Sequence, residues 1–243
     1  MEKQIYVLVG NYGCGKTELS LNMAIQAARA GKKCALVDVD IVNPYFRSGF
    51  HKELLDKEGI KLIAARQTLE AADVPVVAPE VLTAFDSDFD LVLFDVGGDP
   101  VGATALGQYL HKFQQIKSTN LKVIFVVNVF RPLTQTVEDI CEMLEKIQNA
   151  SRLKVTTLFN NAHLVNETTL QHLKQGNIIL QSVAKRMQLP IQYYGIKKGL
   201  YAMFNRQELD KLQGKPVLLD TYTRLEWIDF IPDKQKGRLA EYR

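Results

Sequence analysis

The amino-acid sequence predicts an α/β fold in which a mostly parallel, twisted sheet lies between two layers of helices. Short apolar runs typical of buried strands alternate with longer segments whose apolar residues recur at helical spacing. A glycine-rich turn follows the first of these runs, and later runs end in Asp or Asn. Because strands that alternate with helices are joined by connections crossing the sheet, neighbouring strands run parallel and helices cover both faces.

The expected elements follow from these patterns in chain order. Residues 5–9 form the first strand, and the helix after the glycine-rich turn has a broad apolar face that ends near Gly31. Residues 79–85 read as a short helix or turn, and residues 41–50 as a loop. The other predicted helices are residues 134–149 and 168–187. The other predicted strands are residues 34–40, 59–65, 90–95, 122–128, 155–159 and 190–195, with 190–195 as the final strand.

Length and composition are those of one globular domain. The chain has 243 residues, of which 47% are hydrophobic and 23% are charged. A chain of this size can bury one sizeable core, so we expect a single domain over residues 1–243. No apolar run approaches the ~20 residues that span a bilayer, and the first strand begins too early to leave room for a signal peptide. We therefore expect a cytoplasmic protein without a membrane segment.

Cysteine spacing and net charge argue against several classes of site. Cys14, Cys34 and Cys141 lie far apart without C-x-x-C spacing, so we expect neither a structural zinc site nor disulfides. We interpret Cys14, inside the glycine-rich turn, as a small residue that fits there rather than as a reactive thiol. The net charge is only +3, and we interpret the basic bias of the C-terminal residues as solvated surface rather than as a nucleic acid-binding face.

Residues 10–17 are the strongest functional signal in the chain. They read Gly-Asn-Tyr-Gly-Cys-Gly-Lys-Thr between a strand and a helix start, which is the pattern G-x-x-x-x-G-K-[ST] of a phosphate-binding loop. Glycines let consecutive N–H groups curl around phosphate oxygens, and the helix start adds the positive end of its dipole. An ordinary glycine-rich turn is the alternative, but the chance of this pattern is on the order of one per cent. The motif indicates the three-layer P-loop NTPase form of the α/β fold.

Each polar residue of this loop has an expected role. Lys16 reaches the β- and γ-phosphates and acts in catalysis, and the Thr17 hydroxyl is a ligand of Mg²⁺. The residues of this segment expected to contact the nucleotide are Gly10, Asn11, Tyr12, Gly13, Cys14, Gly15, Lys16, Thr17 and Glu18.

Carboxylates end two of the predicted strands. Asp38 and Asp40 close one strand, and Asp95 closes another that continues into Gly97 and Gly98. In open α/β sheets, ligands bind at these strand ends. A carboxylate followed by glycines suits the water shell of Mg²⁺ beside a loop that can approach the γ-phosphate. Gly97 is therefore an expected nucleotide contact, and the expected metal-site residues are Thr17, Asp38, Asp40 and Asp95.

Two amides, Asn160 and Asn161, follow the predicted strand 155–159 on the same expected ligand side. An amide presents a donor and an acceptor and can read the edge of a purine base. It can equally cap the turn that follows. The residues alone leave both alternatives open.

Together these residues resemble the MinD/ParA group of P-loop ATPases, within the wider class that includes cobyrinic-acid-synthesis-type and dethiobiotin-synthetase-type enzymes. The resemblance covers most of residues 4–196 and rests on the phosphate loop, on residues 38–40 and 91–98, and on an Asn at a late strand end. It implies that Asp40 orients the attacking water, that Asp95 is the carboxylate of the magnesium strand, and that Asn160 contacts the adenine.

The phosphate loop departs from the pattern of this group at two positions. In the group, a lysine directly after the first glycine reaches across a nucleotide-sandwich dimer to the partner's phosphates. Here that position is Asn11, which carries no charge, and Tyr12 replaces a usual glycine. Nucleotide binding survives this difference, whereas an ATP-driven homodimer is left open. Residues 234–243 also lack the apolar face of the basic helix with which membrane-binding members end.

The sequence thus predicts a Mg²⁺-dependent ATP-binding protein that hydrolyses ATP slowly to ADP and uses the bound state to regulate a protein partner. A small-molecule kinase or ATP-dependent synthase of the same fold is one alternative, and a nucleotide-sensing module without chemistry is another. Since no Asp follows Asn160 at the spacing of the guanine motif N-K-x-D, we expect adenine to be preferred over guanine.

Overall fold

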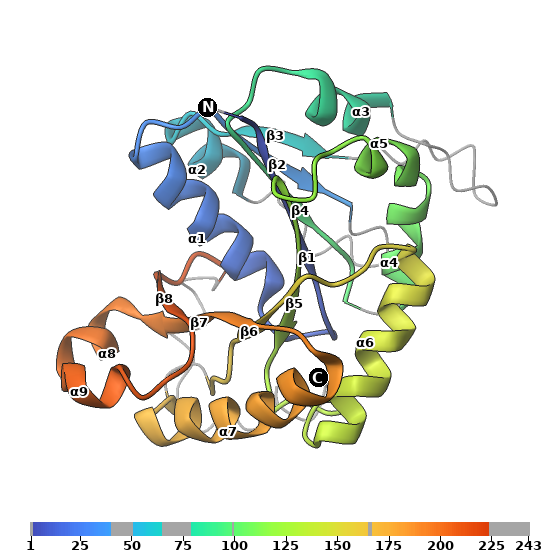
Figure 1. Ribbon diagram of the computed structural model, residues 1–243. Coiled ribbons are helices and arrows are strands. Elements are labelled where there is room, and N and C mark those ends of the chain that lie inside the picture. The colour runs from blue at the N-terminus through green and yellow to red at the C-terminus, as the bar shows by residue number, and fades with distance from the viewer. Residues whose placement is uncertain (1, 40–50, 65–78, 99, 165–166, 224–243) are drawn as a thin grey trace, which may run out of the picture.

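One parallel sheet organises the part of the chain that the computed structural model describes, which is residues 2–39, 51–64, 79–98, 100–164 and 167–223. Its eight strands lie in the order β3-β2-β4-β1-β5-β6-β7-β8, and each neighbouring pair is parallel (Figure 1). The strands are β1 (Gln4–Val9), β2 (Cys34–Asp38), β3 (Lys61–Ala64), β4 (Leu91–Asp95), β5 (Leu121–Val127), β6 (Thr157–Asn160), β7 (Ile191–Lys197) and β8 (Lys215–Leu219). The predicted α/β class is confirmed.

Helices cover both faces of this sheet. The helices α1 (Lys16–Arg29) and α2 (Lys52–Lys57) pack on one face. The opposite face is covered by α3 (Pro79–Asp86), α4 (Pro100–Gly107), α5 (Leu110–Gln114), α6 (Val137–Ser151) and the later turns of α7 (Leu170–Met187). Beside β7 and β8, the start of α7 packs with α8 (Lys198–Met203) and α9 (Arg206–Leu209). The three layers of the prediction are therefore present.

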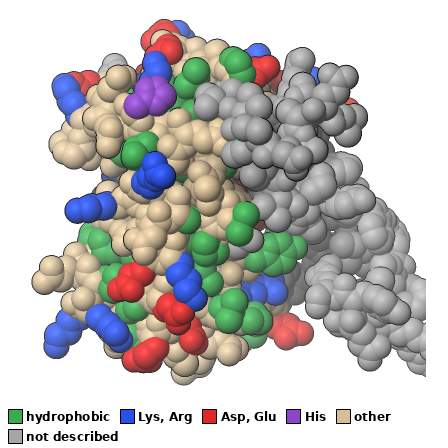
Figure 2. All heavy atoms as spheres, turned by 90° about the vertical axis from the view of Figure 1, so that its right-hand side faces the viewer, with side chains coloured by type: hydrophobic (Ala, Val, Ile, Leu, Met, Phe, Trp, Pro, Cys, Tyr) green, Lys and Arg blue, Asp and Glu red, His purple; other side chains and the backbone are tan. Residues whose placement is uncertain are grey.

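The alternation of side chains along β1 shows how one strand serves both layers. Ile5, Val7 and Val9 belong to the core under α3–α7, whereas Leu8 belongs to the core under α1. Central strands buried on both faces require nearly continuous apolar residues, which is what the sequence has there. On the α3–α6 side of the molecule, Figure 2 shows acidic and basic side chains interspersed with small apolar areas.

The strand order brings the carboxyl ends of the central strands to one edge of the sheet. β1 lies between β4 and β5, and β2 lies on the other side of β4. In the register of these strands, Asp95 of β4 is level with Leu8 of β1 and with Asp38 of β2. The residues that follow β1 therefore enter a space beside two strand-end carboxylates.

Two sequence predictions about elements need correction. Residues 190–195 are not the final strand, because β8 pairs in parallel with β7 beyond them. β8 contains Pro216, which is tolerated there because β8 is an edge strand, where a backbone N–H can be missing. The predicted second strand ends at Asp38, and residues 40–50, including the predicted loop, lie outside the described part of the chain. The helices α2, α4, α5, α8 and α9 also went unpredicted, since four to eight residues give no clear periodicity.

Gly176 allows α7 to approach the end of β6 closely. A Cβ at this position would lie 2.4 Å from Cβ of Ala162 and 2.6 Å from Oδ1 of Asn160. Both neighbours are fully buried. We therefore expect Gly176→Ala to lower the free energy of unfolding by about 1–3 kcal/mol through overpacking, although Ala favours helices by ~1 kcal/mol over Gly. Urea denaturation measures the change.

Gly107→Ala is the matched control in another helix. In the described part of the chain, a Cβ at Gly107 would meet the carbonyl oxygen of Ala150 alone, at 3.8 Å, which is ordinary contact. The urea midpoint of this variant should stay unchanged or rise. Equal stability of the two variants would contradict the close packing of α7 on β6.

Candidate functional site

The predicted phosphate loop joins β1 to α1 through a backbone that glycine adopts without strain. Gly10, Gly13 and Gly15 have φ angles of 151°, 70° and 90°. A Cβ at Gly10 would also lie 2.3 Å from the carbonyl oxygen of Val126, so the loop leaves β1 in direct contact with β5. Other residue types would clash or be strained here, and the path of the loop is therefore fixed by sterics.

Lys16, the first residue of α1, folds over the loop that precedes it. Its Nζ donates hydrogen bonds to the carbonyl oxygens of Gly10 and Asn11, both at 3.1 Å. The side chain is buried, with 7% of the residue exposed. At the far end of the loop, the Gly15 carbonyl accepts from the Leu19 amide at 3.0 Å. The ammonium group is thus already held inside the phosphate loop.

Two side chains from later loops bond the outer side of the same turn. Nε of Arg131, from the β5–α6 connection, donates to the carbonyl oxygen of Gly13 at 3.0 Å. Nδ2 of Asn161, which follows β6, donates to the carbonyl oxygen of Cys14 at 2.7 Å. These bonds tie the phosphate loop to the segments that follow β5 and β6.

The amides of the loop are used differently from its carbonyls. Within the described residues, the amides of Gly13, Gly15 and Thr17 donate to no backbone carbonyl. Among the described residues, no side chain caps the start of α1, so the positive end of the helix adds to these donors. A turn with bonded carbonyls and available amides is suited to binding phosphate oxygens.

Asn11 and Tyr12 stand where the sequence departs from the related ATPases. Asn11 is buried, its Nδ2 donates to the Pro132 carbonyl at 2.7 Å, and its Oδ1 accepts from the Tyr12 amide at 2.8 Å. Tyr12 is 64% exposed, and its Cα lies 2.6 Å from where a Cβ on Gly98 would be. The Asn11 side chain therefore holds the loop to the β5–α6 connection and does not reach outward.

The structure brings two of the predicted metal-site carboxylates together. Asp38 and Asp95 are register partners on adjacent strands and are 7% and 6% exposed. The buried Gly97 follows two residues after Asp95, and Thr17 lies half-buried in the first turn of α1. Asp40, predicted to orient the attacking water, lies outside the described residues.

A metal ion at this edge of the sheet would need ligands from more than the acidic side chains. In the described ranges, no group of three or more His, Cys, Asp or Glu residues is placed to hold a metal. Mg²⁺ suits such a site, because it is usually bound by one or two protein oxygens together with phosphate oxygens and water. The Thr17 hydroxyl and the carboxylates of Asp38 and Asp95 provide donors of this kind.

Asn160 serves the turn after β6. It has no exposed surface, its Nδ2 donates to the Leu173 carbonyl at 3.2 Å, and its Oδ1 accepts from the Ala162 amide at 3.1 Å. These bonds correspond to the capping alternative that the sequence left open. A contact between this amide and a base stays a prediction and would require both bonds to be exchanged.

His163 is a site residue that sequence reasoning missed. Its Cε1 lies 3.4 Å from where a Cβ on Gly15 would be, and its Nδ1 lies 2.7 Å from the carbonyl oxygen of Asn161. Since a carbonyl only accepts, this shorter of two contacts of Nδ1 assigns it the proton, and Nδ2 of Asn128, 3.3 Å from Nδ1, donates instead to the His163 carbonyl at 3.0 Å. Burial lowers the pKa of the imidazole, with smaller lowering by Arg131 and Lys197 and opposing effects of the Asn161 hydrogen bond and Glu18. A neutral ring with an accepting Nε2 therefore stands beside the phosphate loop.

Glu18, predicted as a nucleotide contact, binds the segment that follows β8. Its carboxylate accepts hydrogen bonds from the Tyr222 amide at 2.6 Å and from the amide and hydroxyl of Thr223 at 3.0 and 2.5 Å. The structure thus shows a contact to the protein for this side chain. A contact between Glu18 and a nucleotide remains a prediction.

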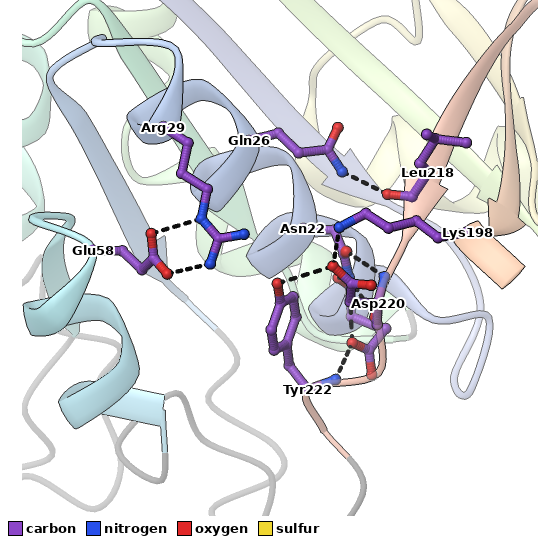
Figure 3. A network of polar contacts seen from close by, with 9 residues as sticks. Asn22, Gln26, Arg29, Glu58, Lys198, Leu218, Asp220 and Tyr222 are labelled. Atoms are coloured by element: carbon purple, nitrogen blue, oxygen red, sulfur yellow. Dashed lines mark hydrogen bonds and ion pairs between the residues drawn. The ribbon is translucent and has the colours of Figure 1, made fainter.

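Further along α1, the same segment is fastened by amide side chains (Figure 3). Asn22 exchanges two hydrogen bonds with the backbone of Asp220, at 2.9 and 2.7 Å. Nε2 of Gln26 donates to the Leu218 carbonyl at 2.5 Å, and the Asp220 carboxylate pairs with Lys198. The helix α1, which presents Lys16 at its start, is therefore anchored to β8 and to the residues after it. No local sequence pattern reveals these contacts.

The three cysteines are free and buried, as expected from their spacing. Burial raises the pKa of the Cys14 thiol, and the nearby Lys16 opposes this only in part. Burial also raises the pKa of Cys34, to about 11. Cys14 is fully buried in the core under α1, where it fills space within the loop.

The chain is similar to known nucleotide-binding proteins over the region that contains this site. The family model of the CobQ/CobB/MinD/ParA nucleotide binding domain matches residues 5–171. No curated protein matches the chain. None of the helices described is long and apolar enough to cross a membrane.

Solved structures share the fold at low identity. Chloroplast FtsY from Physcomitrella patens has a TM-score of 0.55 and 18% identity, covering 82% of this chain and 60% of that one. Cell division protein FtsY from Thermotoga maritima has a TM-score of 0.52 and 20% identity, and the match covers 80% of this chain and 62% of that one. Signal recognition particle 54 kDa protein from Aeropyrum pernix, in complex with GDP, has a TM-score of 0.53 and 14% identity, and the match covers 100% of this chain and 49% of that one. This chain spans less than two thirds of each, and the likeness establishes the fold alone.

Proposed function

Because the chain belongs to the CobQ/CobB/MinD/ParA nucleotide-binding family, we propose that it is a Mg²⁺-dependent ATP-binding protein that hydrolyses ATP slowly and regulates a protein partner. The observation that carries this proposal is the division of roles in the phosphate loop. Its carbonyls at Gly10, Asn11, Gly13 and Cys14 are bonded to side chains, which supports the use of its amides for phosphate. The free cysteines fit a reducing compartment such as the cytoplasm.

The residues around the loop fit a bound nucleoside triphosphate with Mg²⁺. Lys16 is buried within the loop and would pair with the β- and γ-phosphates. Thr17 and the buried Asp95 would hold the ion or its water shell, with Asp38 beside them. The bound ion would offset the charge that develops on the transferred phosphoryl group. Asp40 is our proposed water-orienting residue, through positioning rather than strong basicity.

A switch is favoured over a kinase by what surrounds the loop. Three large hydrophobic side chains, Tyr12, Val101 and Leu133, are each 64–65% exposed. They belong to the phosphate loop, to the first turn of α4 and to the β5–α6 connection. Apolar side chains exposed on segments that border a nucleotide site would be contacts for a partner whose binding depends on the nucleotide. A kinase or synthase of the same fold would instead show metabolite-stimulated ADP release.

Lys16→Ala tests nucleotide binding itself. The variant removes a charge-assisted contact, a kind of interaction worth about 1.5–3 kcal/mol, so we expect affinity for MgATP to fall about tenfold or more. Isothermal titration calorimetry measures the loss. Lys33→Ala is the matched control, because Lys33 precedes β2 at the opposite edge of the sheet and pairs with Asp88 on the surface. Equal affinity of Lys16→Ala and wild type would remove the basis of the proposal.

His163 supports adenine as the preferred base. It stands three residues after Asn160, where the guanine motif N-K-x-D has its Asp. A carboxylate accepts from both the N1–H and the N2 amino group of guanine, whereas a neutral imidazole offers one acceptor, which suits the single N6 amino group of adenine. The Aeropyrum pernix protein, solved with GDP, makes guanine the competitor to test.

Competition between ATP and GTP tests the choice of base. We expect wild type to prefer ATP by about tenfold or more, the scale of one good base contact. His163→Asp should move the preference toward GTP, whereas His111→Asp, on the surface of α5, should leave it unchanged. Displacement of ATP by an equal concentration of GTP from the wild-type protein would contradict the assignment.

A further inference from the structure

Arg131 is a cation held against the phosphate loop. Its Nε donates to the Gly13 carbonyl at 3.0 Å, and three of its side-chain atoms lie 3.5–3.8 Å from where a Cβ on Gly13 would be. The residue is exposed, and within the described part of the chain no carboxylate forms an ion pair with it. Its charge is therefore not neutralised by a described acidic residue.

The loop that carries Arg131 is rigidly built. The Arg131 amide donates to the Asn128 carbonyl at 3.1 Å, and the hydroxyl of the fully buried Thr134 donates to the carbonyls of Asn128 and Arg131 at 2.9 and 3.2 Å. Between them, Leu133 has a φ of 63°, a left-handed conformation that is costly for this residue type. Such strain persists only where the surroundings fix it, and it gathers at functional sites.

We propose that Arg131 is a catalytic residue that supplies, within the same chain, the positive charge needed at the triphosphate during hydrolysis. The proposal rests on the proposed ATPase function. In related ATPases a lysine after the first glycine brings this charge from a partner subunit, and here Asn11 occupies that position and bonds to Pro132, next to Arg131. One N–H of the guanidinium is used on Gly13, and the four on Nη1 and Nη2 are the donors that would meet phosphate oxygens.

Arg131 itself is chemically unchanged by the hydrolysis of ATP. A bond forms between the water oxygen and the γ-phosphorus, and the bond from that phosphorus to the bridging oxygen breaks. ADP leaves with the electron pair, and the proton of the water passes to phosphate. The guanidinium only offsets the charge that develops, which is the role of a cation supplied in cis. The hydrolysis rate per molecule should accordingly be independent of protein concentration.

Three substitutions separate this role from a purely structural one. Nε2 of glutamine is as many bonds from the backbone as Nε of arginine, so Arg131→Gln keeps a donor for the Gly13 carbonyl and removes the charge. Arg131→Met removes both, and Arg131→Lys keeps a charge without the planar fork. Arg186→Gln, in the last turn of α7, is the control for loss of an exposed arginine.

The readouts are affinity for MgADP alone and for MgADP with fluoroaluminate, an analogue of the transferred phosphoryl group, together with ATP turnover. We expect Arg131→Gln to keep MgADP affinity within about threefold, but to lose affinity for the analogue and turnover by about 10²-fold or more. Arg131→Met also releases the Gly13 carbonyl, so it should lose MgADP affinity in addition. The affinity for the analogue and the turnover of Arg131→Lys should lie between those of Arg131→Gln and those of wild type. The control should match wild type.

Other outcomes overturn specific parts of the account. If Arg131→Gln matches wild type and only Arg131→Met is impaired, Arg131 is a tether for Gly13 and the proposal is wrong. If wild type binds MgADP with no gain from fluoroaluminate, nucleotide binding stands and catalysis by Arg131 is refuted. If wild type binds no nucleotide, the proposed function fails first, and the inference fails with it.

Discussion

The structure depends on one backbone constraint, which is that the phosphate loop must satisfy its carbonyl oxygens while leaving amides for a ligand. Lys16 bonds the carbonyls of Gly10 and Asn11, and side chains from the next two strand ends, Arg131 and Asn161, bond those that follow. Buried polar backbone groups are costly when left without partners, which applies to the carbonyls of Gly10, Asn11 and Cys14. The contacts from later strand ends therefore hold the loop in one conformation before a ligand arrives, which favours binding because less ordering remains to be done.

Much of the fold could be predicted because its signals are local. Continuous apolar runs identify the strands buried on both faces, and the amphipathic pattern identifies α1, α6 and α7. β8 could not be found in this way, since Pro216 argues against a strand unless it is known to lie at an edge. Edge position is a property of the whole sheet, and a five-residue segment carries no sign of it.

The residues of the candidate site also fall into those that a local pattern predicts and those that depend on long-range contacts. The glycine positions and Lys16 could be proposed because the phosphate-loop motif has a fixed spacing, and Asp95 because it closes a buried strand before two glycines. The uses of Arg131 and His163 were not, because they depend on long-range contacts to Gly13 and Gly15. At Asn160, a residue type with two possible uses could be assigned to the turn after β6 only once its neighbours were known.

The central claim is that the amides of this loop bind the phosphates of a nucleotide. Amide hydrogen exchange measured by NMR tests it most directly, with Mg²⁺ alone and with MgATP. The account predicts slower exchange at Gly13, Gly15 and Thr17 with MgATP only, while exchange in the distant last turns of α7 stays unchanged. Saturating MgATP binding without any change at these three amides would contradict it, because the nucleotide would then lie elsewhere.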